Sequence, residues 1–514
     1  MRTYSIGQYE GEFYIPEFRG LMQGGDTLNA DARYATDEKN VEIINGALQP
    51  MAAHITLSPA LTGPIETIAR LWRRWYTGPN NLQEILVAAT GGKLYSMYPG
   101  FSSEWTQLAF PTGVSAYQSN DWSWVAYEIN PQGSTAPIDV LILSNALDGM
   151  IMVRGDNLSV TKIDTPKKFG VIARYAERIW GGAIPDDPDM LMYSAPYDPT
   201  DWEQNEEIPE DGAGSVQQPS WDGDSFYALE PFGSQLIAFK KNRVWRVLGT
   251  DPGEYTFKEQ YGGGSAYENT IAVCGEMILM VGKDGIVSYD GLNVSPFQSA
   301  ALENVWRRVN KLYLSQASAV WWKHKYYLAL PVDNSTYNNI VVVWDGRENT
   351  WLKYEDIYAE RFLDGDETLY YTSSTAPGKI TKWATDSRTN GVAMKNAKWV
   401  SPWTDLGAKN ITKDSFEVYF TPEIPVGLNI KLRFTLETER RSKYKDVVIE
   451  KYPYDDPLDP APVHETTEVR QQKIFFGGSG RRFRLIIEWL PSLQEYTPWR
   501  LTGGVLVRCS LDRD

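Results

Sequence analysis

Hydrophobic residues along this chain recur in short runs that are closed by tight turns. Between about residues 64 and 385 the same unit recurs. It consists of an apolar strand, a turn with Gly, Asn or Asp, and a second strand rich in Val, Tyr or Trp. Asn-Gly and Asp-Gly at such positions are typical of β-hairpins. The pattern predicts hairpins within residues 85–97, 140–153, 236–247, 277–291, 325–351 and 368–383.

The spacing of these hairpins favours one architecture. They follow one another at irregular intervals of roughly 40–90 residues, with almost no helical periodicity between them, which is typical of propeller blades. We expect residues 61–392 to form a β-propeller of five to seven blades. A row of β-sandwiches is the alternative, but it requires more even strand spacing. One short helix is expected between blades at residues 300–312, where Leu302, Val305, Val309 and Leu312 follow helical spacing.

The pattern changes after residue 392. Residues 415–420, 429–438 and 482–490 alternate between apolar and polar with period two, which predicts strands with one buried face. Residues 393–514 are therefore expected to form a separate antiparallel, sandwich-like domain. Residues 1–60 look like an irregular arm with a hairpin turn at Asn45-Gly46, and part of this arm is expected to join the C-terminal domain.

Composition agrees with an all-β chain and narrows its function. The 514 residues include 66 aromatic side chains, 42 Gly and 30 Pro, which suit pleated sheets joined by turns. The formal net charge of −16 argues against a protein that holds nucleic-acid phosphates by bulk charge. Two cysteines exclude a disulfide framework, and no apolar run approaches the ~20 residues of a membrane span.

Catalytic motifs are scarce. His54, His324 and His464 are the only histidines, and there is no nucleophile elbow, phosphate-binding loop, zinc spacing or calcium-binding loop. We therefore expect no cofactor, no metal and no enzymatic activity. Paired carboxylates are the exception, because glycosidases on propellers use two acids. The candidates mostly occupy hairpin turns, where Asp is favoured by turn geometry, and they are Asp222, Asp224, Asp284, Asp290 and Asp345.

Several motifs carry a resemblance to a known family. Trp344-Asp345, with Asn349 and Trp351 following, resembles a kelch-type blade strand. In pattern and order, most of the chain resembles the β-propeller tail hub or nozzle proteins of short-tailed bacteriophages. The segments that carry this wider resemblance are 37–50, 91–95, 178–182, 193–202, 236–245, 281–291, 481–489 and 499–507.

The resemblance implies a function and partners. Such a protein is a structural, non-enzymatic part of the virion tail, made in the cytoplasm of the bacterial host. It forms a ring, usually a hexamer, that docks beneath an adaptor ring of the head–tail connector and contacts tail fibre or needle proteins. Genomic double-stranded DNA passes through the centre without specific binding, and the N-terminal arm and C-terminal domain form the ring platform. Two alternatives remain open: a carbohydrate-active or glycan-binding propeller, and a receptor binder at the tail tip.

One long segment is a candidate contact surface within this picture. Residues 185–220 are Pro-rich and acidic, and they are interpreted as a large exposed loop. We expect its carboxylates to face the DNA channel or a partner ring, whereas a solvated outer loop or a calcium site without regular ligand spacing are the alternatives. Trp202 within this polar stretch favours a packing partner. The carboxylates are Asp186, Asp187, Asp189, Glu203, Glu206, Glu207, Glu210 and Asp211.

A local basic cluster is the second candidate. Arg70, Arg73 and Arg74 lie close together in an otherwise acidic chain, and they could meet phosphate or a neighbouring subunit. We expect the subunit contact.

Overall fold

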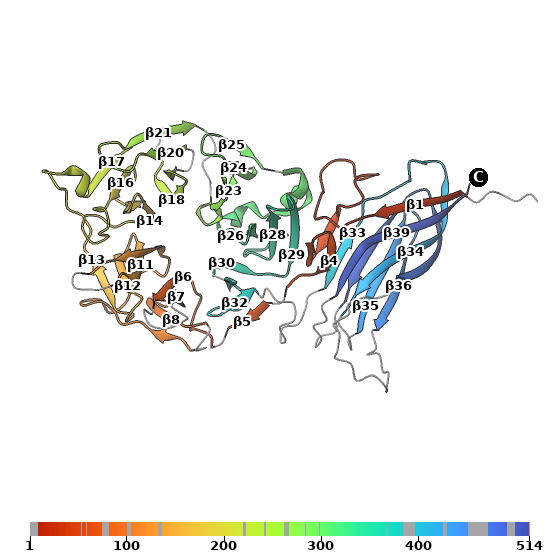
Figure 1. Ribbon diagram of the computed structural model, residues 1–514, viewed down its shortest axis with the longest axis horizontal. Coiled ribbons are helices and arrows are strands. Elements are labelled where there is room, and N and C mark those ends of the chain that lie inside the picture. The colour runs from red at the N-terminus through yellow and green to blue at the C-terminus, as the bar shows by residue number, and fades with distance from the viewer. Residues whose placement is uncertain are drawn as a thin grey trace, which may run out of the picture.

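Short apolar strands joined by tight turns fold into seven four-stranded antiparallel sheets around a central axis, with two larger sheets beside them (Figure 1). The chain is therefore all-β, with a β-propeller and a second β-domain, as the sequence predicts. The computed structural model describes residues 9–512 apart from 53, 58, 75–81, 100–103, 132–135, 219–222, 241–242, 262–266, 283, 298, 366, 384–395, 425–428, 451–470 and 491–498.

The propeller has seven blades within the described residues, which is the upper limit of the predicted range. Blades 1 to 3 consist of β6 (Thr67–Arg74), β7 (Leu82–Thr90), β8 (Lys93–Met97), β9 (Thr106–Gln107); β10 (Ser123–Ile129), β11 (Ile138–Asn145), β12 (Gly149–Arg154), β13 (Val160–Ile163); and β14 (Val171–Tyr175), β15 (Arg178–Gly182), β16 (Met190–Tyr193), β17 (Gly214–Gln217).

Blades 4 to 7 follow the same order. They consist of β18 (Phe226–Phe232), β19 (Gln235–Lys240), β20 (Arg243–Leu248), β21 (Thr256–Tyr261); β22 (Ala272–Cys274), β23 (Met277–Gly282), β24 (Gly285–Tyr289), β25 (Val294–Pro296); β26 (Ser318–Trp322), β27 (Lys325–Leu330), β28 (Ile340–Asp345), β29 (Thr350–Glu355); and β30 (Ala359–Asp364), β31 (Leu369–Ser373), β32 (Ile380–Trp383), β5 (His54–Thr56).

The last blade is closed by a strand from the other end of the propeller sequence. β5 precedes blade 1 in the chain, but it pairs antiparallel with β32, so that His54 lies opposite Trp383 and Thr56 opposite Thr381. The Leu57 amide adds a hydrogen bond of 2.7 Å to the Ile380 carbonyl. Because the chain continues from β5 into blade 1, the hydrogen bonds between β5 and β32 close the ring of blades. Residues 54–56, which the sequence analysis assigns to the arm, thus belong to the propeller.

A short helical segment separates blades 5 and 6, as the spacing of apolar residues predicts. It comprises the 3₁₀ turn η3 (Ser299–Leu302), the helix α1 (Glu303–Arg308) and the 3₁₀ turn η4 (Lys311–Gln316). The buried residues of this segment, Leu302, Val305 and Leu314, pack into the main core. Within the described part of the chain, no helix is long and apolar enough to span a bilayer.

The second domain, called the platform here, is a sandwich of two sheets. Its six-stranded sheet has the order β3-β4-β39-β34-β37 with β1 also on β39, and its five-stranded sheet has the order β2-β33-β38-β35-β36. The bounds are β1 (Tyr9–Ile15), β2 (Asp37–Lys39), β3 (Val41–Ile44), β4 (Ala47–Pro50), β33 (Ala397–Val400), β34 (Thr412–Glu423), β35 (Asn429–Thr438), β36 (Ser442–Glu450), β37 (Gln472–Gly480), β38 (Phe483–Trp489) and β39 (Arg500–Asp512).

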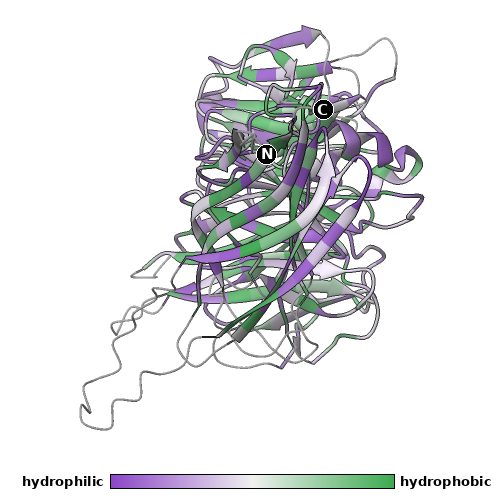
Figure 2. Ribbon diagram, turned by 90° about the vertical axis from the view of Figure 1, so that its right-hand side faces the viewer, coloured by the Kyte–Doolittle hydropathy of each residue, from purple (hydrophilic) through white to green (hydrophobic). Residues whose placement is uncertain are grey.

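Local sequence explains these platform strands. Asn45 and Gly46 both adopt positive φ angles, of 52° and 74°, between β3 and β4. This is the type I′ turn that the dipeptide predicts. β38 alternates strictly between buried and partly exposed residues, and the sheet strands show alternating hydrophobic and hydrophilic bands when the platform faces the viewer (Figure 2). The buried residues of the two sheets face each other and form the sandwich core.

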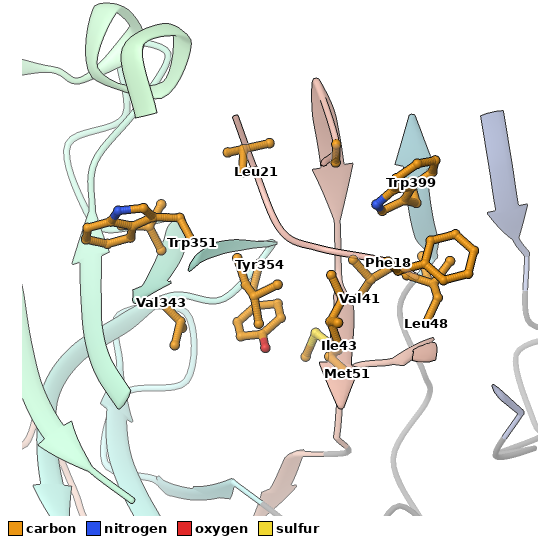
Figure 3. Packing of buried hydrophobic residues seen from close by; sticks show 14 of the residues in the cluster. Phe18, Leu21, Val41, Ile43, Leu48, Met51, Val343, Trp351, Tyr354 and Trp399 are labelled. Carbon is orange, nitrogen blue, oxygen red and sulfur yellow. The ribbon is translucent and has the colours of Figure 1, made fainter. Parts of the chain in front are cut away.

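The propeller and the platform share one hydrophobic core (Figure 3). Trp351 and Tyr354 of β29 extend from blade 6 toward Leu21, Ile43 and Met51 of the N-terminal region. The backbone reinforces this packing, because the Leu21 amide donates to the Trp351 carbonyl at 2.7 Å. The segment from Leu21 to Met51 therefore connects the two domains.

Candidate functional site

A cavity of about 650 Å³ occupies the centre of the propeller. The cavity is lined by residues at or beside the first strand of every blade, and these strands are β6, β10, β14, β18, β22, β26 and β30. Such a volume is in the range of small-molecule sites. Its lining combines aromatic side chains such as Trp124, Tyr227 and Phe362 with six charged ones, namely Glu66, Asp121, Arg174, Glu230, Glu268 and Arg361.

Glu230 is the charged residue that the fold places most unusually. It lies on β18 opposite Ile237, in a strand whose neighbours Ala228 and Leu229 are buried. A register shift between Phe226 and Ala228 changes the alternation of this strand. Burial raises the pKa of the Glu230 carboxyl to about 8. The carboxyl is therefore mostly protonated at neutral pH and can donate a hydrogen bond as well as accept one.

Glu268 reaches the same cavity from the neighbouring blade. It begins the 3₁₀ turn η2 (Glu268–Thr270), just before β22. Although the residue is exposed to the cavity, desolvation by the surrounding wall raises the pKa of its carboxyl to about 7, the negative charge of Asp121 adds to the rise, and Arg361 opposes it. The cavity thus holds two carboxyls that titrate near neutral pH, which is a property of general acids and bases. No group of carboxylates, histidines or cysteines suited to a metal ion occurs among the described residues.

Glu230→Gln is expected to stabilise the protein at alkaline pH. Between pH 4.5, the ordinary value for Glu, and about 8, the unfolded chain loses this proton while the folded chain keeps it. The free energy of unfolding of the wild type therefore falls with rising pH across this window and levels off above it. Glu230→Gln has no proton to lose here, so its free energy of unfolding should exceed that of the wild type by roughly 2 kcal/mol at pH 8.5. This is about half of the value that the full pKa shift would give, because cavity water screens the charge.

Urea unfolding followed by tryptophan fluorescence from pH 4 to 9 measures this difference. Glu207→Gln is the control, because the Glu207 side chain is exposed on blade 3. A constant difference between Glu230→Gln and wild type across the pH range would show that the folded protein does not retain the proton.

The predicted acidic loop contains more structure than the sequence suggests. Residues 185–218 include β16, the 3₁₀ turn η1 (Pro209–Asp211) and β17, so the interpretation of 185–220 as one large loop is wrong. This blade lies on the side of the propeller away from the platform (Figure 1). Trp202 is buried and packs on Phe169, with ring centroids 4.9 Å apart, which agrees with the expected packing partner.

The eight carboxylates of this segment fall into two groups. Asp187 forms an ion pair of 2.8 Å with Lys167, and Asp189 forms one of 2.6 Å with Lys240. The other six side chains are exposed on blade 3, and they are Asp186, Glu203, Glu206, Glu207, Glu210 and Asp211. None of the eight lines the cavity at the propeller axis. Their role at a ring channel or a partner ring concerns an assembly and stays a prediction.

The three arginines of β6 tie parts of one chain together. Arg70 donates to the Asp364 carbonyl of blade 7 at 2.7 Å, and Arg74 binds the Asp139 carboxylate of blade 2 at 2.7 Å. Arg73 donates to the Tyr98 hydroxyl within blade 1 at 3.3 Å. Contacts within one chain are therefore an alternative explanation for the three neighbouring arginines. The predicted subunit contact of Arg70, Arg73 and Arg74 is not tested by a single chain.

The carboxylates and histidines weighed as catalytic groups do not form one site as far as the described residues show. Asp345 accepts from the Arg347 amide at 2.9 Å in the β28–β29 turn, and Asp290 accepts from the Leu292 amide at 2.8 Å. Both therefore serve turn geometry, as expected. His54 lies in β5 with Nδ1 2.7 Å from the Tyr371 hydroxyl oxygen. Asp222 and His464 lie outside the described residues.

Sequence reasoning did not identify Glu230 and Glu268 as site residues. Each is a single Glu within an ordinary strand or turn, and their sequence spacing shows no motif. A lone Glu among buried positions of a strand, as in Tyr227-Ala-Leu-Glu-Pro, is the available signal.

Comparisons with known proteins yield only distant structural similarity. No family model and no curated protein matches the sequence. The computationally designed Ika8 protein is 10% identical, with a TM-score of 0.36, and the match covers 71% of this chain and 99% of that one. The Pan2 WD40 domain of Neurospora crassa is 12% identical, with a TM-score of 0.36 and coverages of 66% and 96%. The β-propeller domain of the trilobed protease from Pyrococcus furiosus is 13% identical, with a TM-score of 0.33 and coverages of 62% and 96%.

These similarities are too low to carry an argument about function. The seven four-stranded sheets of the chain themselves define the propeller.

Proposed function

We propose that this protein is a structural subunit of a ring in the virion tail of a short-tailed bacteriophage, a hub or nozzle through which double-stranded DNA passes. The observation that carries the proposal is the platform, which presents free strand edges on two opposite sides. The resemblance in order and pattern of motifs supplies the family, and a hexamer beneath an adaptor ring is the assembly proposed with it.

The first free edge is β36. It pairs with β35, and among the described strands none pairs with its other side. Nearly all of its described residues are exposed, including Tyr444 at 62% and Val448 at 56%. Long exposed edge strands are sites of association unless a partner covers them.

The second free edge is β1. It pairs with β39 on the side opposite to β34, and no other described strand pairs with it. Tyr14 of β1 is 54% exposed. In the six-stranded sheet, β1 lies on one side of the β39–β34 pair and β37 lies on the other. β36 of the second sheet contacts β37, so the β1 and β36 edges are on different sides of the sandwich. Two different surfaces on opposite sides permit head-to-tail contacts, and these form a ring when the rotation between neighbouring subunits closes.

The contact between propeller and platform also suits a ring component. Lys353 of β29 forms ion pairs with Asp37 of β2 at 2.8 Å and with Glu355 at 3.0 Å, and its amide donates to the Glu38 carboxyl at 2.9 Å. Burial raises the pKa of the Glu38 carboxyl well above its ordinary value, and the Lys353 amide and charge oppose this rise. Together with the shared core, this network supports a propeller held in a fixed position on the platform.

Replacing two exposed residues of β36 is expected to weaken ring assembly. Tyr444→Glu with Val448→Glu places charges at the proposed contact and should weaken assembly about tenfold or more, because interface energy concentrates in a few apolar anchors. Mass photometry of the purified chain over a concentration series measures the species present. We expect hexamers for the wild type and monomers for the variant.

The matched control is Tyr197→Glu with Leu312→Glu, because both residues are highly exposed on the propeller side of the molecule. It should assemble like the wild type. A wild type that stays monomeric at all concentrations, or equal loss in both variants, would contradict the proposal.

One observation favours a second candidate function. The central cavity, with Glu230 and Glu268 protonated in part at neutral pH and aromatic side chains in its lining, suits a carbohydrate-active or glycan-binding propeller. Glu230→Gln with Glu268→Gln distinguishes the two candidates. It would abolish turnover or retention of a polysaccharide in this second case, and it would leave ring assembly unchanged in the first.

A further inference from the structure

Three turns meet at one end of the platform, beside the C-terminal label in Figure 1. They are residues 405–411 before β34, residues 438–441 between β35 and β36, and residues 480–482 between β37 and β38. The Glu439 carboxylate accepts hydrogen bonds from the Arg481 amide at 2.7 Å and the Arg482 amide at 3.2 Å. The first turn is connected through Lys413, whose Nζ donates to the Ile411 and Arg481 carbonyls at 2.9 and 2.6 Å.

This end of the platform, called the basic end here, concentrates positive charge in a chain of net charge −16. All five cationic side chains of these turns are exposed, and none forms an ion pair among the described residues. The five residues are Lys409, Arg440, Arg441, Arg481 and Arg482.

Two acids lie near these turns and are held by other groups, although the charges of Lys409 and Arg440 contribute to lowering the pKa of Asp405 and of Glu439, respectively. Asp405 is buried and accepts from the Gly407 amide at 2.8 Å and the Asn29 side chain at 2.7 Å. Glu439 is occupied by the two backbone amides of the β37–β38 turn. By contrast, Arg484 and Arg433 on the neighbouring strands pair with Glu437 and Asp446, each at 2.7 Å. The five cations of the turns have no such ion pair among the described residues.

We propose that the basic end is a contact surface for the phosphodiester backbone of duplex DNA. Arginine guanidinium groups suit phosphate geometry, and exposed cations on adjoining turns are able to follow successive phosphates. No large hydrophobic side chain is exposed within the three turns, whereas protein interfaces depend on buried aromatic anchors. The acidic remainder of the chain restricts the contact to this surface, so DNA is held locally and released readily.

This inference deepens the proposed function, because that function supplies duplex DNA as the partner. It places the phosphate contact at the basic end and not at the β6 arginines, since Arg70 and Arg74 already bind groups in neighbouring blades. The role of the basic end does not require a complete ring, so it can be measured on the purified chain.

Fluorescence anisotropy with a labelled 20-base-pair duplex of mixed sequence tests the contact. The wild type should bind, and the logarithm of its affinity should fall with the logarithm of salt concentration with a slope of about −4 for four to five phosphate contacts. The variant Arg440→Gln, Arg441→Gln, Arg481→Gln, Arg482→Gln should bind at least about tenfold more weakly and have a slope near −1.

A control variant removes four exposed cations outside the basic end, and it is Lys93→Gln, Lys311→Gln, Arg347→Gln, Lys379→Gln. It has the same net charge as the test variant and should retain most of the wild-type affinity and slope. Equal losses in the two variants would show a bulk charge effect and overturn the proposal.

A labelled poly-glutamate peptide provides a second arm. Binding of the peptide but not of the duplex would identify an acidic protein partner and overturn the DNA assignment. Because duplex binding and ring assembly are measured separately, a wild type that binds DNA but stays monomeric would contradict the proposed function alone. A hexamer that does not bind DNA would contradict this inference alone.

Discussion

Trp383→Ala is expected to lower the free energy of unfolding of the propeller by about 3–5 kcal/mol. Trp383 ends β32 and is only 2% exposed. The centroid of its ring lies 4.2 Å from that of His54 in the closing strand β5. The ring centroids of Tyr327 and Tyr354 in blade 6 lie 5.1 and 5.4 Å away, respectively. Removing it leaves a cavity where blade 7, the closing strand and blade 6 meet, so the loss should weaken closure of the propeller as well as its core.

Urea unfolding followed by circular dichroism measures this effect, and limited proteolysis reports opening near β5. Trp383→Phe is the conservative control, because it retains an aromatic ring and should cost clearly less. Equal stability of the alanine variant and the wild type would mean that β5 does not depend on this aromatic cluster for its position.

Asp189→Ala is expected to destabilise the protein by about 3–5 kcal/mol, because it leaves a buried charge without its partner. Its partner Lys240 has a side chain with 0% exposure. Lys240 Nζ also donates to the Gln218 carbonyl at 2.9 Å and lies 4.5 Å from the centre of the Phe226 ring. The pair connects β19 of blade 4 with the segment before β16 of blade 3, so its loss should loosen the contact between these blades.

Asp187→Ala is the matched control for this prediction. Asp187 lies two residues away and pairs with Lys167, but both side chains are about one-third exposed. Such a pair contributes at most about 1 kcal/mol, so the control should unfold near the wild-type denaturant concentration. Asp189→Leu combined with Lys240→Met should recover much of the loss, since an apolar pair removes the buried charge. A similar cost for Asp187→Ala and Asp189→Ala would contradict the assigned burial of Lys240.

Local chemistry determined much of the fold directly from the sequence. Asn45-Gly46 specifies a type I′ turn because both residues accept positive φ angles, and the structure has this turn. The apolar spacing of residues 302–309 specifies a helical segment, and α1 lies there. Strict alternation specifies β38 with one buried face. In each case the information is contained within about ten neighbouring residues, which is the range over which backbone geometry and hydrophobic periodicity act.

Tertiary structure alone decided which distant segments meet. His54–Thr56 has no local property that assigns it to blade 7, because a three-residue strand depends on its partner β32 for its hydrogen bonds. The same holds for the stretch 185–218, where β16 and β17 are short strands that complete blade 3.

The candidate sites depended on tertiary structure even more strongly. Glu230 and Glu268 come from blades 4 and 5, and they share a cavity because seven first strands surround one axis. The basic end combines turns from three parts of the chain, joined through Glu439 and Lys413. Asp187 and Asp189 are alike in sequence, yet one pairs near the surface and the other with a fully buried lysine. Sequence determined these strands and turns because their causes are local, whereas burial and charge pairing depend on neighbours that only the folded chain brings together.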